Sequence, residues 1–132
     1  MHPTHKKARE FAEAELEKLG YSVTTEKYPW TVISPEGKPF DVRVAGLRVK
    51  NSWPVREEKS TGNQLFHILV VTGKCDGDKP CFFIMTQEEV RKENDGYRSK
   101  LKKDGTKRSE NCPGFTFTQA WQYKGEWGKL PK

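Results

Sequence analysis

The chain has 132 residues, 33% hydrophobic and 32% charged, which suits a single domain with one modest core. An aromatic content of 11% argues against disorder, and apolar runs such as residues 68–71 are far too short to span a membrane. A net charge of +6 and a pI near 9.2 favour polyanionic partners. We therefore expect one domain over residues 1–132 that binds nucleic acid and does not enter a membrane.

The N-terminus and the cysteines both suggest a reducing compartment. No apolar segment typical of a secretory signal follows "MHPTHKKARE", so we expect a cytoplasmic protein. Cys75, Cys81 and Cys112 are an odd number without a CxxC pair, and no ligand spacing typical of zinc accompanies them. We therefore expect free thiols and no structural zinc.

An amphipathic helix is the clearest element and is predicted over residues 4–19. Its apolar residues recur at three- and four-residue spacing, as on one helix face: Ala8, Phe11, Ala12, Leu16 and Leu19. Thr4 is a suitable N-cap, and Gly20 is a suitable residue just beyond the C-terminal end.

Strands and shorter helices follow in order. The β-forming or apolar segments that predict strands are residues 21–28, 30–34, 65–73 and 81–86. Thr86 and Glu89 form a capping box that begins a short helix, and the aromatic residues of 116–130 have near-helical spacing. This order predicts an α/β or α+β fold, with a mixed central sheet flanked by helices.

The stretch "PFDVRVAGLRVKNSW", residues 39–53, carries the most informative chemistry. Its apolar residues alternate on either side of Ala45-Gly46, which predicts a β-hairpin with a two-residue turn. Side chains alternate between the two faces of a strand. In such a hairpin Asp41 would lie opposite Lys50 on a polar face, while the valines would pack into the core.

The predicted polar face of this hairpin is also basic. Arg43 and Arg48 would lie opposite each other there, beside Lys50. The residues expected to contact nucleic acid are Arg43, Arg48, Asn51, Ser52 and Trp53. In the simplest alternative, Asp41 and Lys50 are an ordinary cross-strand ion pair on a solvated face.

Four segments together resemble the PD-(D/E)xK nuclease superfamily, which includes many restriction endonucleases. They are the helix ending "LEKLGYSV", then "FDVRVAGLRVKNSW", "LFHILVV" and "CFFIMTQEEV", so the resemblance covers about residues 6–92. Asp41 matches the first acid of the motif, Lys50 its lysine, and Asn51-Ser52 the small polar residues after it. The resemblance implies a restriction-endonuclease-like fold and a Mg²⁺-dependent phosphodiesterase, with Asp41 as metal ligand and Lys50 assisting the attacking water.

Arg48 departs from the motif, because an acid is expected at this position. Mg²⁺ prefers oxygen ligands, and a cation beside Asp41 would repel it. Another carboxylate would have to complete the site. The candidates are Glu57 or its neighbour Glu58, in "REEK", and Glu10 on the first helix.

Three functions therefore stay open. The first is a Mg²⁺-dependent endonuclease, or a degenerate relative of one, with Asp41, Lys50, Glu57 and Glu10 as catalytic residues. The second is a non-catalytic DNA- or RNA-binding module that uses the basic face of the 39–53 hairpin. The third is a small accessory protein-interaction domain, and in each case the chain could form a homodimer. His67 is expected to be a core histidine, and Trp121 and Trp127 to pack rather than to stack on bases.

Overall fold

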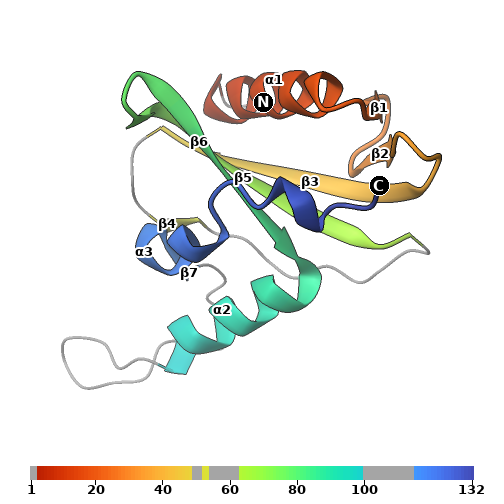
Figure 1. Ribbon diagram of the computed structural model, residues 1–132. Coiled ribbons are helices and arrows are strands. Elements are labelled where there is room, and N and C mark those ends of the chain that lie inside the picture. Colours follow the sequence, from red (N-terminus) through yellow and green to blue (C-terminus); the bar gives the residue numbers. More distant parts are fainter. Residues whose placement is uncertain (1–2, 49–51, 54–62, 100–114) are drawn as a thin grey trace.

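A five-stranded mixed sheet organises the chain, with helices on both of its faces (Figure 1). The computed structural model describes residues 3–48, 52–53, 63–99 and 115–132. The first half holds α1 (Pro3–Lys18), β1 (Ser22–Thr24), β2 (Trp30–Ile33), β3 (Pro39–Leu47) and β4 (Ser52–Trp53). The second half holds β5 (Leu65–Asp76), β6 (Lys79–Thr86), α2 (Gln87–Ser99), β7 (Phe115–Thr116), α3 (Phe117–Ala120) and the 3₁₀ turns η1 (Trp121–Tyr123) and η2 (Trp127–Lys129).

The strand order is β1-β2-β3-β5-β6, and β4 pairs with β7 in a separate two-stranded sheet. The β3–β5 pair is parallel, whereas the other neighbours in the large sheet are antiparallel. In Figure 1, α1 lies above the sheet and α2 and α3 lie below it. The predicted α+β fold, a mixed sheet flanked by helices, is confirmed. Within the described ranges no helix has the length and apolarity needed to cross a membrane.

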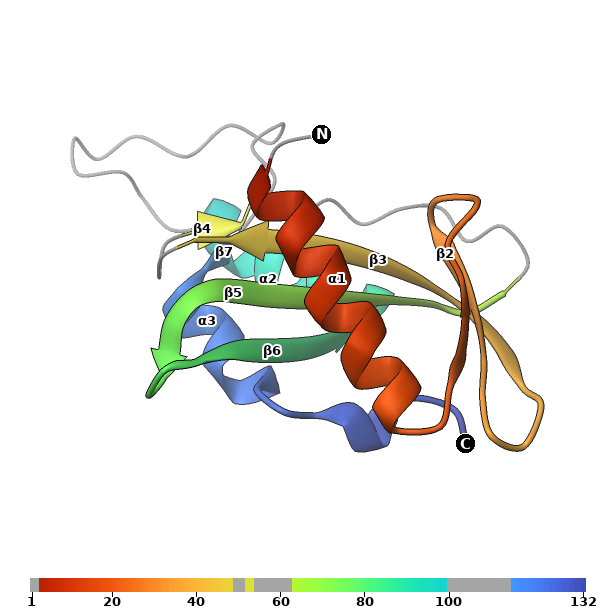
Figure 2. The same cartoon turned by 90° about the horizontal axis from the view of Figure 1, so that it is seen from above.

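Helix α1 crosses the sheet diagonally (Figure 2) and buries its predicted apolar face against it. Ala8, Ala12 and Leu16 are fully buried, whereas Leu19 at the end of the stripe is 44% exposed. The helix ends at Lys18, and Gly20 follows its C-terminal end as expected, with a positive φ of 93° that costs glycine little. The helix begins at Pro3, so Thr4 lies within the first turn and is not the N-cap that the sequence predicted. Proline is well suited to the first position of a helix.

The predicted hairpin at Ala45-Gly46 does not form, because β3 continues straight through both residues. From Asp41 to Leu47 this strand pairs in parallel with β5, so its ladder is formed with a strand that comes later in the chain. Gly46 serves a different purpose from a turn. A Cβ there would lie 2.6 Å from the Cβ of Ala8, so the missing side chain lets α1 approach β3 closely.

The alternation of side chains along the sheet creates two hydrophobic clusters, one on each face. The cluster on the α1 face contains Val42 and Val44 of β3. The cluster on the opposite face contains Ala45 and Leu47, together with Tyr123 from the C-terminal segment. The near-continuous apolar run predicted for β5 is confirmed and serves both clusters, as expected for a strand covered on both sides.

The β5–β6 hairpin carries a disulfide between Cys75 and Cys81, with the two Cα atoms 5.7 Å apart. The expectation of free thiols is therefore wrong for these two residues. Their spacing of six residues gave no recognised motif, but the turn at Gly77, with φ of 65°, places them across from each other. Cys112 lies outside the described residues.

The C-terminal segment is held to α2 by the buried carboxylate of Glu93 and by an ion pair between Lys129 Nζ and Glu89 Oε1 (2.8 Å). Glu93 is 7% exposed, and its oxygens accept hydrogen bonds from Tyr123 Oη (2.6 Å), Gln122 Nε2 (3.3 Å) and Gln119 Nε2 (3.3 Å). The predicted single helix over 116–130 is instead α3 followed by two 3₁₀ turns, and Gly125 has a φ of 68° between those turns.

We expect the stability of the fold to fall above about pH 10. The pKa of Tyr123 is raised chiefly by burial, and also by the hydrogen bond that it donates to Glu93 and by the negative charge of Glu93. In the unfolded chain the same hydroxyl releases its proton near pH 10. The folded state then binds more protons than the unfolded state, so the free energy of unfolding drops by about 1.4 kcal/mol per pH unit for this group. Urea unfolding between pH 9 and pH 11 should show a smaller drop for Tyr123→Phe than for the wild type. Equal drops would contradict the assignment.

Candidate nucleic-acid interface

Asp41, the predicted metal ligand, lies at the start of β3 and is 9% exposed. Its backbone N–H donates to Gln64 O (2.8 Å), and its Oδ1 lies 3.4 Å from Asn63 Nδ2, a weak hydrogen bond. By strand alternation its side chain points away from α1, because Val42, the next residue, packs on the α1 face. Glu10 is exposed on α1, so the structure does not bring this carboxylate to Asp41.

The two arginines expected on one basic face lie on opposite faces of the sheet. Arg43 points to the same face as Asp41, whereas Arg48 lines a cavity with residues of α1. Since Arg48 comes seven residues after Asp41 along an extended strand, the two are about 23 Å apart. The prediction of a basic face shared by Arg43 and Arg48 was wrong, because it depended on a turn at Ala45-Gly46 that does not form.

The remaining predicted site residues fall in or beside the connection between β3 and β5. Lys50, Asn51 and Glu57 lie outside the described residues, and Ser52 and Trp53 form β4, paired with β7. Across residues 3–48, 52–53, 63–99 and 115–132, no three His, Cys, Asp or Glu side chains are grouped closely enough to hold a metal ion.

A polar row that the sequence did not reveal follows Asp41 across the same face. Arg43 is in register with His67 of β5, whose Nε2 lies 2.7 Å from Gln87 Oε1 at the start of α2. His67 is 2% exposed, which confirms the expected core histidine. With the amide oxygen as acceptor, Nε2 carries the proton. The row bridges the sheet to α2, and the separation of its members in sequence explains why no local motif predicted it.

Arg43 also takes part in an aromatic contact at the edge of β3. Its guanidinium carbon lies 5.1 Å from the centre of the Tyr28 ring, and that of Arg9, from α1, lies 3.8 Å from the same ring. The Tyr28 hydroxyl accepts a hydrogen bond from Val44 N (2.8 Å) and donates one to Val44 O (3.0 Å). It thus pairs with the backbone groups of β3 at a position past the end of the β2 pairing. Both arginines therefore contribute to packing of this edge.

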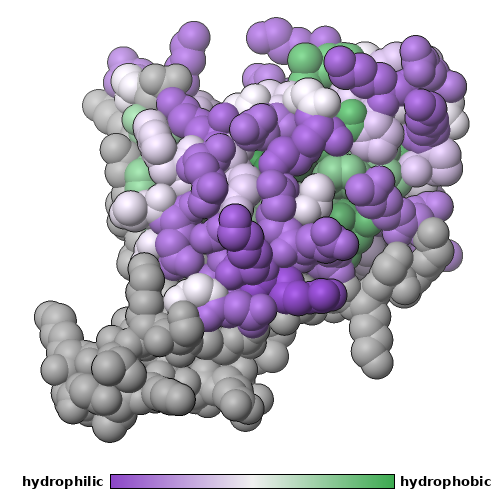
Figure 3. Space-filling model, turned by 60° about the horizontal axis from the view of Figure 1, so that its bottom comes forward, coloured by the Kyte–Doolittle hydropathy of each residue, from purple (hydrophilic) through white to green (hydrophobic). Residues whose placement is uncertain are grey.

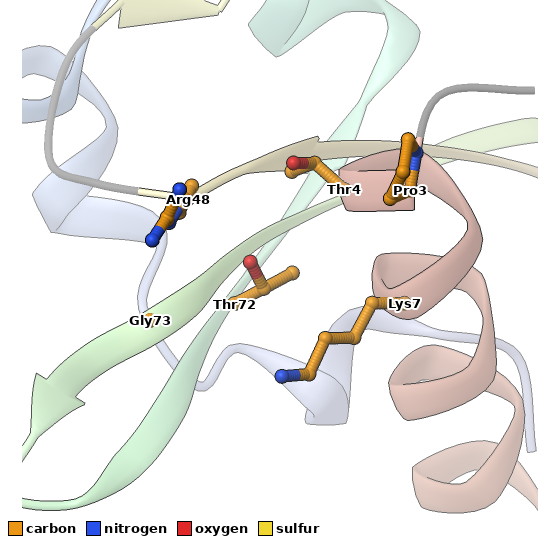
Figure 4. Close-up of a pocket in the computed structure, with 6 residues that line it drawn as sticks. All are labelled: Pro3, Thr4, Lys7, Arg48, Thr72 and Gly73. Atoms are coloured by element: carbon orange, nitrogen blue, oxygen red, sulfur yellow. The ribbon is translucent and has the colours of Figure 1, made fainter.

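A basic cavity lies at the other end of β3, where this strand, β5 and the first turn of α1 meet (Figure 4). Its volume is about 490 Å³, and it is lined by Pro3, Thr4 and Lys7 of α1, by Arg48, and by Thr72 and Gly73 of β5. In Figure 4 Lys7 extends from α1 and Arg48 lies beyond the end of β3, with Thr72 between them. The cavity thus combines two cations that come from separate parts of the chain, Lys7 on α1 and Arg48 after β3.

Close backbone contacts fix the shape of this cavity. A Cβ on Gly73 would collide with the carbonyl oxygen of Arg48, so only glycine permits the approach of β5 to the end of β3. The Thr72 hydroxyl donates to Leu47 O (3.3 Å) and ties the same two strands together. Arg48 is therefore placed by backbone geometry although its side chain is exposed.

The electrostatics of the cavity favour an anion. Lys7 and Arg48 are both exposed cations, and the first turn of α1 contains no acidic residue to offset the positive end of the helix dipole. Arginine and lysine both bind phosphate, arginine through a planar fork and lysine as a point charge. The arrangement can therefore hold a phosphate group by charge and hydrogen bonding.

The chain matches no model of a protein family, and the search of curated proteins finds no similar sequence.

Proposed function

We propose that this chain is a nucleic-acid-binding module that contacts the phosphate backbone in the cavity between Lys7 and Arg48. The observation that carries the proposal is that these two cations, from α1 and from the end of β3, line one cavity. This is the second of the functions expected from the sequence, at a different place from the expected hairpin face.

Charge and surface character support nucleic acid as the ligand. The chain has 24 Lys and Arg against 18 Asp and Glu, and phosphate contacts supply most of the affinity in non-specific binding of nucleic acid. Figure 3 shows the side of the molecule away from α1, and the coloured residues there are mostly hydrophilic. A mostly hydrophilic surface suits polar and charged contacts better than contact with an apolar protein surface.

The test is the binding of a labelled DNA duplex by Lys7→Gln/Arg48→Gln at several salt concentrations. Each cation that contacts a phosphate contributes about one unit to the slope of log affinity against log salt concentration. We therefore expect the double variant to lose about two units of slope and at least about tenfold in affinity at low salt. Fluorescence anisotropy measures both quantities.

The matched control is Lys27→Gln/Lys38→Gln, which removes the same charge from exposed positions that do not line the cavity. Lys38 directly precedes β3, at the opposite end of that strand from Arg48. If the control loses as much affinity and slope as the cavity variant, the binding is a general effect of charge and the site is misassigned. Absence of any binding by the wild type at low salt would overturn the function itself.

A metal-dependent phosphodiesterase, as the PD-(D/E)xK resemblance implies, is the second candidate. It is favoured by the buried carboxylate of Asp41 at the start of β3, beside Asn63. Mg²⁺-dependent cleavage of DNA that disappears in Asp41→Ala would establish it. Binding without cleavage in Mg²⁺ or Mn²⁺ would leave the binding module as the function.

A further inference from the structure

Trp121 is the most exposed of the large hydrophobic side chains in the described part of the chain. It lies in η1, directly after α3, and is 50% exposed. An indole offers a large apolar area, and leaving half of it in water forgoes part of the stabilisation that burial would give. The packing role expected from the sequence therefore accounts for only part of this side chain.

The exposed indole is held in place from behind by other aromatic rings. Its ring centre lies 5.6 Å from that of Phe117 and 6.5 Å from that of Phe83, which is itself fully buried. The preceding helix α3 begins with a complete capping box, in which Thr116 and Gln119 exchange hydrogen bonds. The Trp121 side chain is therefore held in place by its neighbours, and a ligand that binds to it causes little further loss of side-chain conformational entropy.

A cation accompanies the ring. Lys124 Nζ lies over the Trp121 ring, 4.8 Å from its centre, so this side chain must leave the ring when a base stacks on that face. The Lys124 backbone forms a bridge with Phe83 at the edge of β6. A half-exposed aromatic ring next to a lysine is the combination by which proteins bind single-stranded nucleic acid, the ring stacking on a base and the cation contacting the backbone.

We propose that Trp121 stacks on an unpaired base and that Lys124 binds the phosphate next to it, so that the chain prefers single-stranded to duplex nucleic acid. This proposal rests on the proposed function, because it assumes that nucleic acid binds at all. In a duplex the faces of the bases are covered by their neighbours, so a single protruding indole gains no stacking there. The cavity at Lys7 and Arg48 contacts phosphate in either form, whereas the Trp121 surface distinguishes between them.

The experiment compares the binding of a twelve-nucleotide oligo(dT) and of a twelve-base-pair duplex by the wild type and Trp121→Leu. Loss of one stacked base is expected to weaken oligo(dT) binding about tenfold. Duplex binding should stay within about twofold of the wild type. Leu19→Ala is the matched control, because it truncates another exposed apolar side chain, 44% exposed on α1, and should change neither affinity.

A second variant keeps the test independent of folding defects. Trp121→Phe retains an aromatic ring against Phe117 and Phe83, so it should fold and bind oligo(dT) within about threefold of the wild type, and it lacks only the fluorescence of the Trp121 indole. Quenching of tryptophan fluorescence by oligo(dT) should therefore be large in the wild type and much smaller in Trp121→Phe.

The outcomes separate the two proposals. Equal binding of oligo(dT) by the wild type and Trp121→Leu, or equal quenching in the wild type and Trp121→Phe, would overturn the stacking role while leaving duplex binding at the cavity intact. Failure of the wild type to bind either nucleic acid would overturn the proposed function and the stacking role with it.

Discussion

Replacement of Glu93 by alanine is expected to lower the free energy of unfolding by about 3 kcal/mol, one of the two largest effects expected for a single substitution in this chain. The carboxylate accepts hydrogen bonds from Tyr123, Gln122 and Gln119, which belong to the C-terminal segment. Hydrogen bonds to a charged group contribute more than neutral ones, and the buried Tyr123 hydroxyl would lose its partner.

Urea unfolding at neutral pH measures this effect, with Glu88→Ala as the control on the same helix. Glu88 is exposed, so its removal should change the stability by less than about 0.5 kcal/mol. Glu93→Gln should fall between the two, because its amide oxygen can still accept one hydrogen bond whereas its NH₂ group meets other donors. A stability for Glu93→Ala equal to that of Glu88→Ala would show that the carboxylate does not hold the C-terminal segment to α2.

The elements that the sequence predicted well are those decided by local contacts. Helix α1 follows from apolar spacing and ends just before Gly20. Both hydrogen bonds of the predicted capping box are present, from Thr86 N to Glu89 Oε1 (2.9 Å) and from Glu89 N to Thr86 Oγ1 (3.2 Å). In each case the interacting residues lie within a few positions of one another, so composition and spacing are sufficient evidence.

The failures come from pairings that are distant in the chain. An Ala-Gly pair between two alternating runs fits a turn, but it fits equally well a strand interior that another element approaches closely. The contact of Gly46 with α1 decides between them, and no local pattern contains this information. The parallel pairing of Asp41 with Leu65 likewise joins residues that the intervening segment separates widely.

The basic cavity could not be predicted for the same reason. Lys7 belongs to the polar side of an amphipathic helix, and Arg48 occupies a position at which the family resemblance leads one to expect an acid. Their proximity depends on where α1 crosses the sheet, which is set by the small residues Gly46 and Ala8. Glycine in an otherwise apolar strand was the one available signal of a close approach.

We expect Gly46→Ala to destabilise the fold by about 2 kcal/mol and to weaken DNA binding as well. The new methyl group would lie 2.6 Å from the Cβ of Ala8 and 3.0 Å from the carbonyl oxygen of Thr4, so the first turns of α1 must move. Thr4 and Lys7 line the cavity and would move with them. Gly128→Ala is the control, because a Cβ at Gly128 meets nothing within 4 Å and should leave both stability and binding nearly unchanged.

A double-mutant cycle with Ala8→Gly separates this close approach from a turn at Ala45-Gly46. A glycine needed for a turn would be equally damaging to replace whether or not residue 8 carries a Cβ. If α1 lies directly on Gly46, Ala8→Gly removes the main collision, and the double variant should be more stable than the sum of the single effects predicts by about 1 kcal/mol. The contact with the carbonyl oxygen of Thr4 remains, so the rescue should be partial. Strict additivity of the two changes would contradict the packing of α1 on β3, and with it the origin of the cavity.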